Sequence, residues 1–262
     1  MPPRAYVLLG LPLLLLPAAC DEPTPSAPGT STATAALSAA AAALPAPTPE
    51  AKQEPPAPRP RKRPQDCPKG AVVTLPAGDF EAAVRLKSRK PKGDLTRSDL
   101  ARLRSLNLSQ TPLDELDPCV FGPMRDLKEL FLGKGNLEDL SPLAHLTNLE
   151  SLRVSLNPIV DVSPLAGMTH LDRLDLAHTR VVDLTPIGKL THLTELMLSS
   201  TPVKDLTPLA QLTSLEVLTL DETQVTDLSP LRGLKSLKTL DITGAPVADP
   251  TSIMRPGLKV QQ

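Results

Sequence analysis

A leucine pattern that returns every 22 residues constrains this chain more than any other feature. Six segments start 22 residues apart, at positions 127, 149, 171, 193, 215 and 237, and read LKELFL, LESLRV, LDRLDL, LTELML, LEVLTL and LKTLDI. A seventh segment, LRSLNL, starts at residue 103. Self-similarity at this period predicts a solenoid of stacked coils. One coil cannot bury its own leucines, so each coil must pack against its neighbours.

The repeat that begins at Leu149 shows the expected elements. Leu152 and Val154 alternate with polar residues, which is typical of a strand with one buried face. Beyond them the apolar spacing lengthens to about three residues, the period of a 3-10 turn. We therefore predict an α/β solenoid with a curved parallel sheet on the concave face and short 3-10 turns on the convex face. The predicted buried positions are Leu149, Leu152, Val154, Ile159, Val162, Leu165 and Met168.

A second motif, Asp-x-Ser/Thr-Pro, follows each of five strands. The Asp side chain can accept a hydrogen bond from the amide two residues on, which makes an Asx-turn. Ser or Thr is then the expected N-cap of one helical turn, and Pro suits the first helical position. A calcium site is the alternative, but the turn chemistry accounts for every letter of the motif. The motif begins at Asp139, Asp161, Asp183, Asp205 and Asp227.

These repeats resemble the leucine-rich repeat family, and within it the bacterial internalin-like class with 22-residue repeats, over about residues 76–255. The resemblance implies a solenoid fold and a protein-binding role. At the position where the family has Asn, this chain has one Asn, three Thr and two residues that cannot bond. We expect the fold to persist with weaker bonding at both ends. These positions are Asn157, Thr179, Thr201, Thr223, Gly135 and Ala245.

The two ends of the solenoid need caps, because a terminal coil otherwise exposes an apolar edge. Residues 67–102 do not fit the repeat and look like the helical N-terminal cap of internalin-type proteins. A first helix is predicted from the helical spacing of Phe80, Ala83, Val84 and Leu86. A second is predicted to start at Thr96, which opens a sequence like a capping box. The solenoid proper is predicted over 103–262, with a capping strand at 258–260.

The first 19 residues are predicted to be an export signal. Arg4 precedes a short apolar run with prolines, and small residues lead to Cys20. The end of this segment resembles a lipoprotein lipobox, which implies lipidation of Cys20, although Pro17 departs from the usual Leu. We therefore expect an exported cell-envelope lipoprotein, attached to either membrane through Cys20. Ordinary cleavage and free secretion is the alternative.

Residues 20–66 are predicted to be a disordered Ala/Pro-rich tether. The chain has 31 Pro and only 2% aromatic residues, and many of the prolines fall in this segment. A basic run, RPRKRP at 59–64, could contact anionic polymer or lipid headgroups. A solvated linker is the interpretation we favour for it.

Cysteine usage indicates one possible bridge. If Cys20 is lipidated, Cys67 and Cys119 remain as a pair in an oxidising compartment. A disulfide between them would fasten the cap to the solenoid, and two free buried thiols are the alternative.

No residue pattern predicts catalysis or a cofactor. Phosphate-binding glycine loops, nucleophile motifs and paired zinc cysteines are missing from the sequence. His170 and His192 share one repeat position, but the same position holds Asn or Ser in other repeats, so a metal site is not expected. The net charge of −1 and the scarcity of aromatic residues disfavour nucleic acid. We therefore do not expect an enzyme.

The outward strand positions of the concave sheet are the predicted binding surface. Exposed Phe131 and Met197 are not polar filler, and Arg and aromatic residues are frequent in binding hot spots. We predict a non-catalytic module that binds a protein or peptide there. A solvated face is the alternative for the surface, and a structural envelope or tethering protein is the alternative for the function. The predicted contact residues are Phe131, Arg153, Arg173, Asp175, Glu195, Met197 and Asp221.

Overall fold

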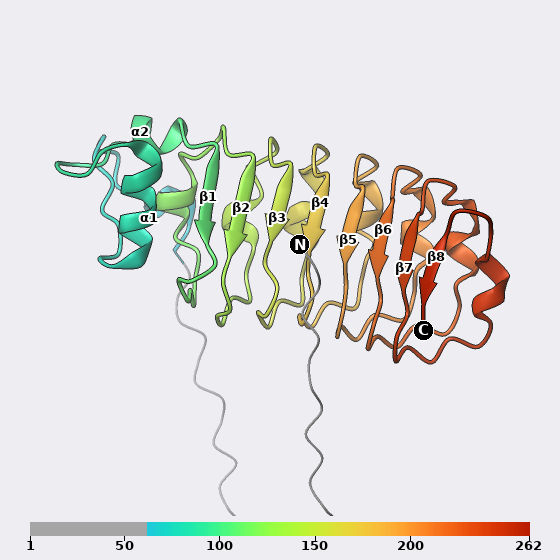
Figure 1. Cartoon of the computed structure of the whole chain (residues 1–262). Coiled ribbons are helices and arrows are strands. Elements are labelled where there is room, and N and C mark those ends of the chain that lie inside the picture. The colour runs from blue at the N-terminus through green and yellow to red at the C-terminus, as the bar shows by residue number, and fades with distance from the viewer. Residues whose placement is uncertain (1–61) are drawn as a thin grey trace, which may run out of the picture. The chain divides into compact units, whose positions relative to one another are not determined.

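The computed structural model describes residues 62–262, which build a solenoid around one parallel sheet (Figure 1). Eight strands lie side by side in the order of the sequence, and the sheet does not close on itself. Seven of them coincide with the seven leucine segments, so the predicted fold class is confirmed. The strands are β1 (Ser105–Leu108), β2 (Glu129–Leu132), β3 (Ser151–Arg153), β4 (Arg173–Asp175), β5 (Glu195–Met197), β6 (Val217–Thr219), β7 (Thr239–Asp241) and β8 (Lys259–Gln261).

The strand register follows the repeat without a slip. Leu152 pairs with Leu174, and Leu174 pairs with Leu196. At the C-terminal end Leu240 pairs with Val260, so the predicted capping strand exists one residue later than expected. Equivalent side chains therefore stack in columns across the sheet, and the leucine columns point inward together.

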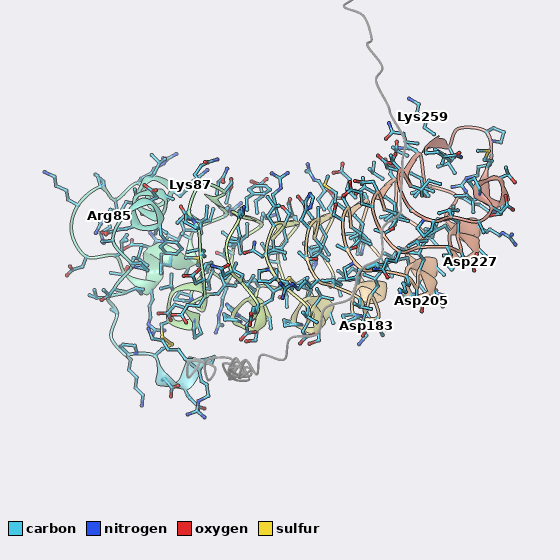
Figure 2. All side chains as sticks on the ribbon, turned by 90° about the horizontal axis from the view of Figure 1, so that it is seen from below. Arg85, Lys87, Asp183, Asp205, Asp227 and Lys259 are labelled. Carbon is cyan, nitrogen blue, oxygen red and sulfur yellow. A yellow bond between two sulfur atoms is a disulfide. The ribbon has the colours of Figure 1, made fainter. Side chains whose placement is uncertain are left out.

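From the second coil onward, the return side of the coil carries a 3-10 turn that an aspartate starts. The Asp161 carboxylate accepts a hydrogen bond from the Ser163 amide at 2.8 Å, and the other four motifs repeat this bond at 2.8 Å. The predicted Asx-turns are confirmed, and Figure 2 shows three of these aspartates in sequence along the turn side. The turns are η2 (Ser141–Leu143), η3 (Ser163–Gly167), η4 (Ile187–Lys189), η5 (Thr207–Gln211), η6 (Ser229–Gly233) and η7 (Pro250–Ile253).

The expected N-cap role of the Ser and Thr hydroxyls was wrong. In four of these turns the N-cap position is held by the Leu or Val before the Ser or Thr, and in η4 it is held by Pro186. No side chain at these positions makes a capping hydrogen bond. The Ser163 hydroxyl instead donates to Asp161 at 2.9 Å, and Ser229 donates to Asp227 at 2.6 Å. Because the carboxylate already accepts the free amide, the hydroxyl reinforces the aspartate rather than the turn.

The core is one continuous cluster of mostly aliphatic side chains that runs the length of the described unit. Every predicted buried position of the repeat from Leu149 to Met168 is at most 1% exposed. The cluster extends without a break from Phe80 in the cap to Ile253 near the C-terminus. Within residues 62–262, no buried side-chain polar atom lacks a hydrogen-bond partner.

The Asn and Thr residues at the shared repeat position bond in different ways. Asn157 donates to the carbonyl of Gly133 in the preceding coil at 3.0 Å and accepts from the Leu137 amide at 3.2 Å. Thr179 and Thr201 donate only to carbonyls three residues back in their own coils, at 2.7 and 2.6 Å. A Thr hydroxyl at this position therefore bonds a carbonyl within its own coil but does not link two neighbouring coils.

Two helices cap the N-terminal end, α1 (Asp79–Ser88) and α2 (Arg97–Ala101). Phe80 and Val84 on α1 are buried against the first coil, as predicted. Leu86 was expected in the same face, but it is 77% exposed. Since Leu86 lies about 200° around a helix from Val84, its side chain points away from the solenoid.

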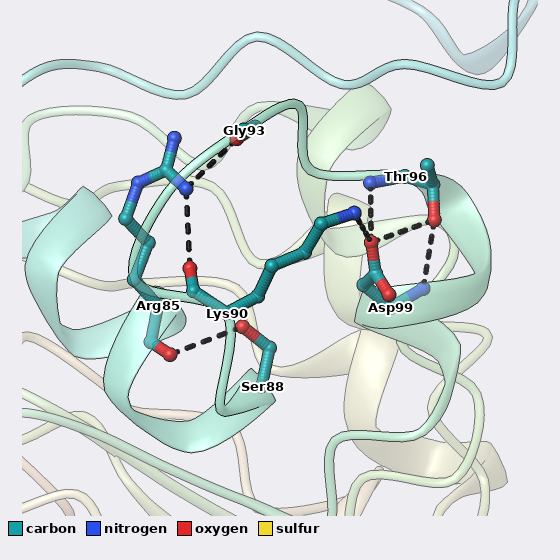
Figure 3. Close-up of polar contacts among 6 residues, drawn as sticks. All are labelled: Arg85, Ser88, Lys90, Gly93, Thr96 and Asp99. Atoms are coloured by element: carbon teal, nitrogen blue, oxygen red, sulfur yellow. Dashed lines mark hydrogen bonds and ion pairs between the residues drawn. The ribbon is translucent and has the colours of Figure 1, made fainter.

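The capping box predicted at Thr96 is confirmed (Figure 3). The Thr96 hydroxyl accepts from the Asp99 amide at 3.2 Å, and the Asp99 carboxylate accepts from the Thr96 amide at 2.9 Å. Lys90 donates to the same carboxylate at 2.8 Å. The bonds from Lys90 and Thr96 hold the pKa of Asp99 well below its usual range.

A third helix, α3 (Pro118–Phe121), was not predicted. It occupies the lengthened first repeat, and the Asp117 side chain caps it by accepting from the Cys119 amide at 2.8 Å. The buried Phe121 ring meets the Phe80 ring edge-to-face, with 6.1 Å between their centroids. The insertion thus packs the cap onto the first coil.

Candidate binding surface on the concave sheet

Each strand presents its first and third residues on the concave face, and the register sorts them into two rows. The first row is Ser105, Glu129, Ser151, Arg173, Glu195, Val217, Thr239 and Lys259. The second row is Asn107, Phe131, Arg153, Asp175, Met197, Thr219, Asp241 and Gln261. Charged and apolar side chains are concentrated over β2 to β5, in the middle of these rows.

A hollow of about 150 Å³ lies at this place. Its floor includes Leu152, Leu174 and Ser151, which is only 8% exposed. Pockets for small organic ligands are usually about 300–1,000 Å³, so the hollow suits a single side chain of a partner better than an enclosed ligand. The remaining lining residues are Glu129, Phe131, Arg153, Arg173, Asp175, Glu195 and Met197.

Arg153 is held in place over the hollow by two neighbours in its row. Its guanidinium lies 5.8 Å from the centroid of the Phe131 ring, and its Nε donates to Asp175 at 2.9 Å. Asp175 also accepts from the Ser155 hydroxyl at 3.2 Å and from the Ala177 amide at 3.0 Å. Because ring and carboxylate both fix the guanidinium, less side-chain entropy is lost when a partner contacts it.

Arg173 is much less constrained. Its side chain is 58% exposed, and its ion pair is a 3.4 Å contact with the adjacent Asp172. Glu195 is its neighbour in the first row, and Glu129 lies two strands away on the opposite side. Neither carboxylate makes an ion pair within residues 62–262. The hollow therefore offers one available cation between two available carboxylates, beside the apolar side chain of Met197.

The structure brings together six of the seven predicted contact residues, and Asp221 is the exception. Asp221 does not line the hollow and follows the end of β6. It accepts a hydrogen bond from the Ser199 hydroxyl, which also contacts the Thr219 hydroxyl at 2.9 Å. Asp221 thus belongs to a polar ladder between coils. Glu129 lines the hollow and was not predicted, although its place in the first row could have revealed it.

Gly133 follows β2 and does not contribute to the concave surface. It is buried, and a side-chain carbon added there would lie 2.4 Å from the Ser109 carbonyl oxygen. The coil backbones approach too closely at this point for any other residue.

Cys67 and Cys119 are joined by a disulfide with a Cα–Cα distance of 5.2 Å. The bridge connects the start of the cap, ahead of α1, with α3 of the first coil. Nearby, Lys62 contacts the Asp117 carboxylate at 2.8 Å, and Pro64–Asp66 forms the 3-10 turn η1. The segment predicted to be tether, 20–66, therefore has ordered contacts in residues 62–66. The predicted signal 1–19, Cys20 and the rest of the tether lie outside the described residues.

The histidines do not form a metal site in the described part of the chain. His145 contacts the Phe121 carbonyl at 3.2 Å, and its burial lowers its pKa. His170 contacts the Thr147 carbonyl at 3.1 Å. Residues 62–262 contain no group of three or more His, Cys, Asp or Glu placed to hold an ion. Among the same residues, no helix has the length and apolar character needed to cross a bilayer.

Two sequence models of leucine-rich repeats match the chain, "Leucine Rich repeats (2 copies)" at residues 169–211 and "Leucine rich repeat" at residues 101–159. Internalin C2 from Listeria monocytogenes is 31% identical with a TM-score of 0.63, and the match covers 69% of this chain and 80% of internalin C2. This chain is an internalin-like leucine-rich repeat protein. No curated protein sequence matches it.

Two further solved structures resemble this internalin-like protein. The internalin inlF of Listeria monocytogenes is 26% identical with a TM-score of 0.54, over 65% of this chain and 57% of the other. A leucine-rich repeat protein of Leptospira interrogans shares the fold at 21% identity and a TM-score of 0.51, over 63% of this chain and 50% of the other. Internalin-like repeat proteins generally mediate protein–protein interaction and are typically non-catalytic.

Proposed function

We propose that this internalin-like protein binds a protein or peptide partner through the concave face of its sheet. The hollow over β2 to β5 carries the proposal. There a constrained Arg153, an available Arg173 and the apolar side chains of Phe131 and Met197 share one small area. Arginine and aromatic residues are the groups that most often dominate binding energy at interfaces.

The charges of the hollow define the chemistry of the partner. Arg173 can donate hydrogen bonds to a carboxylate, while Glu195 beside it and Glu129 two strands away favour basic or amide groups of the same partner. Met197 and Phe131 offer apolar contact beyond these charges. The expected ligand is therefore a segment that presents one acidic side chain beside a basic one and an apolar neighbour.

We also propose that the protein is exported and displayed on the cell envelope as a lipoprotein anchored at Cys20. The support comes from the signal-like residues 1–19 and from the disulfide between Cys67 and Cys119, since such bonds persist in oxidising compartments. Palmitate labelling of the native chain against Cys20→Ala tests the anchor. Equal labelling of both chains would eliminate it.

In-cell photo-crosslinking tests the concave face. A photoreactive residue replaces Met197 in one strain and Lys189, an exposed residue of η4, in a matched strain. We expect a discrete adduct from position 197 and none from 189. Adding Arg173→Glu should reduce the adduct at position 197 at least tenfold, because it repels the expected carboxylate.

The outcome separates binding from a purely structural role. Equal crosslinking at positions 197 and 189, or an adduct that Arg173→Glu leaves unchanged, would refute the concave-face proposal. A structural envelope or tethering protein without a specific ligand would then be the better description.

A further inference from the structure

Charge is divided very unevenly along the described unit, although the whole chain is close to neutral. Residues 62–104, which hold the helical cap, contain 11 Lys and Arg against 5 Asp and Glu. Residues 105–262, which hold the rest of the solenoid, contain 13 against 20. One end of the solenoid is therefore strongly basic and the remainder is acidic, a contrast that the net charge conceals.

Several cations of the cap are engaged in holding its structure. Arg85 pairs with Glu81 at 2.7 Å, and Lys90 pairs with Asp99 at 2.8 Å. Arg97 donates to the carbonyls of Gly70 and Pro68. These groups are not available to a partner without loss of internal contacts.

Six other cations of the cap are exposed and make no ion pair within residues 62–262. Three of these, Lys87, Arg89 and Lys92, lie in the last turn of α1 or in the loop after it. Arg85 brings them together, because its guanidinium donates to the carbonyls of Lys90 at 3.2 Å and Gly93 at 3.0 Å (Figure 3). These two bonds fold the loop after α1 back against the helix. Lys92 is thereby kept close to the last turn of α1, which carries Lys87.

An apolar side chain lies among these free cations. Leu86 is 77% exposed, precedes Lys87 and lies three residues before Arg89. We call Leu86, Lys87, Arg89 and Lys92 the basic tip. Figure 1 shows α1 at the end of the solenoid, and Figure 2 shows Lys87 near that end, far from the turn-side aspartates.

We propose that the basic tip docks on the anionic headgroup surface of a lipid bilayer, with Leu86 entering the boundary of the acyl region. Cations that surround a protruding apolar side chain match such a surface, since it offers both negative charge and hydrocarbon. The proposal goes beyond the concave-face function and depends neither on that partner nor on lipid at Cys20.

The net negative charge of residues 105–262 restricts which part of the solenoid can approach the membrane. Like charge disfavours contact between residues 105–262 and the same membrane surface within about 10 Å, the screening length at 0.1 M salt. The cap then meets the bilayer while the concave face stays open to a partner.

A second copy of the chain fits the basic tip less well. The exposed aspartates of the turn side already accept hydrogen bonds from their own turns, as Asp183 and Asp205 do. A second copy would also offer Leu86 no hydrocarbon region in which to bury its side chain.

Vesicle co-sedimentation tests the proposal with the chain from Asp21 onward, which keeps the entire described unit and lacks the apolar segment that could itself insert. Vesicles contain either phosphatidylcholine alone or phosphatidylcholine with 30% phosphatidylglycerol, a fraction of about one third chosen to give surface charge. We expect binding to the anionic vesicles only. Lys87→Glu with Arg89→Glu and Lys92→Glu should weaken it on the order of 100-fold. Leu86→Ser should weaken it about tenfold.

The matched control reverses the same number of charges elsewhere. Lys189, Lys204 and Lys235 are exposed residues of the later coils without ion pairs among the described residues, and their change to Glu should alter affinity less than fivefold, a shift of about one charge contact. Circular dichroism confirms that each variant is folded.

Three results would overturn the proposal. These are equal losses in the two triple variants, equal binding to neutral vesicles, and competition by millimolar inorganic phosphate with no contribution from Leu86. Salt-sensitive self-association that disappears with the tip variant, in place of vesicle binding, would assign the tip to a second copy instead.

Discussion

The two ends of the solenoid solve the same problem by different means. At the N-terminal end, α1 covers the first coil, Phe80 and Phe121 pack together, and a disulfide joins the start of the cap to α3. At the C-terminal end a shortened coil provides η7 and β8, and Arg255 donates to the carbonyls of Leu234 and Leu237.

The difference shows what a repeat can and cannot provide. The C-terminal cap reuses the repeat, since β8 continues the register of β7 and Ile253 occupies a leucine-like buried position. The N-terminal cap needs sequence that does not repeat, because helices must replace a missing coil. The N-terminal closure is also covalent, whereas the C-terminal closure depends on packing and hydrogen bonds alone.

Removing the covalent closure should have the largest effect. Cys67→Ser with Cys119→Ser should lower the free energy of unfolding by about 4 kcal/mol, because the bridge constrains a 52-residue separation in the unfolded chain. Urea unfolding measures the loss, and hydrogen exchange should quicken from α1 to β1 but not at β8. Unchanged stability in the double variant would contradict an N-terminal end fastened by this bond.

Weakening the C-terminal closure should cost somewhat less. Ile253→Ala removes a buried side chain and should lower the free energy of unfolding by about 3 kcal/mol. In a stacked array the damage should stay local, so exchange should quicken at β7 and β8 while the cap is unaffected. Uniform acceleration over all eight strands would instead mean that the two ends unfold as one unit.

A third change tests the bonding between coils nearer the N-terminal end. Asn157→Thr should lower the free energy of unfolding by about 2 kcal/mol, because the Leu137 amide and Gly133 carbonyl lose their partner. Thr201→Ser is the control, since a Ser hydroxyl can keep the bond to the Leu198 carbonyl. Equal losses in the two variants would argue against a coil-joining role for Asn157.

The smallest predicted effects are those of acid, which should destabilise the two ends of the solenoid at different pH values. Burial lowers the pKa of His145, so its contribution is complete above about pH 6.5 and declines as the pH falls. Hydrogen bonds from Thr207 and Thr251 lower the pKa of Asp205 and Asp249. The contribution of these two carboxylates to stability is therefore complete above about pH 3.9 and is lost as the pH falls below that value.

Hydrogen exchange at pH 7, 5 and 3 measures this order. It should quicken first near α3 and η2, which His145 joins, and only at the lowest pH in the later turns. The same order in His145→Gln would contradict the assignment.

Most of the fold follows from the sequence because the leucines of each repeat can be buried only against the neighbouring coils. The strands, the register and the Asx-turns all derive from the 22-residue period and from local chemistry. Leu86 was placed wrongly because the helical spacing was not projected onto a face. The helix α3 was missed because it occurs once, in an insertion without a repeat to compare.

The candidate site was predictable as a set of positions but not as a geometry. The register alone places Arg153 between Phe131 and Asp175. Rotamers decide that its guanidinium is fixed there while Arg173 makes one longer ion pair with Asp172, and sequence spacing does not reveal these rotamers. The basic tip was missed for a similar reason, since the loop that carries Lys92 is held against α1 by hydrogen bonds from the Arg85 side chain to the Lys90 and Gly93 carbonyls.

The bridge between Cys67 and Cys119 also sets how the molecule would carry a mechanical load. Tension applied along the chain ahead of Cys67 passes through the two sulfur atoms directly into the first coil. The 51 residues between the cysteines, α1 and α2 among them, lie on a bypassed branch and bear none of that pull. The helices can therefore keep their shape while the chain that precedes them is stretched.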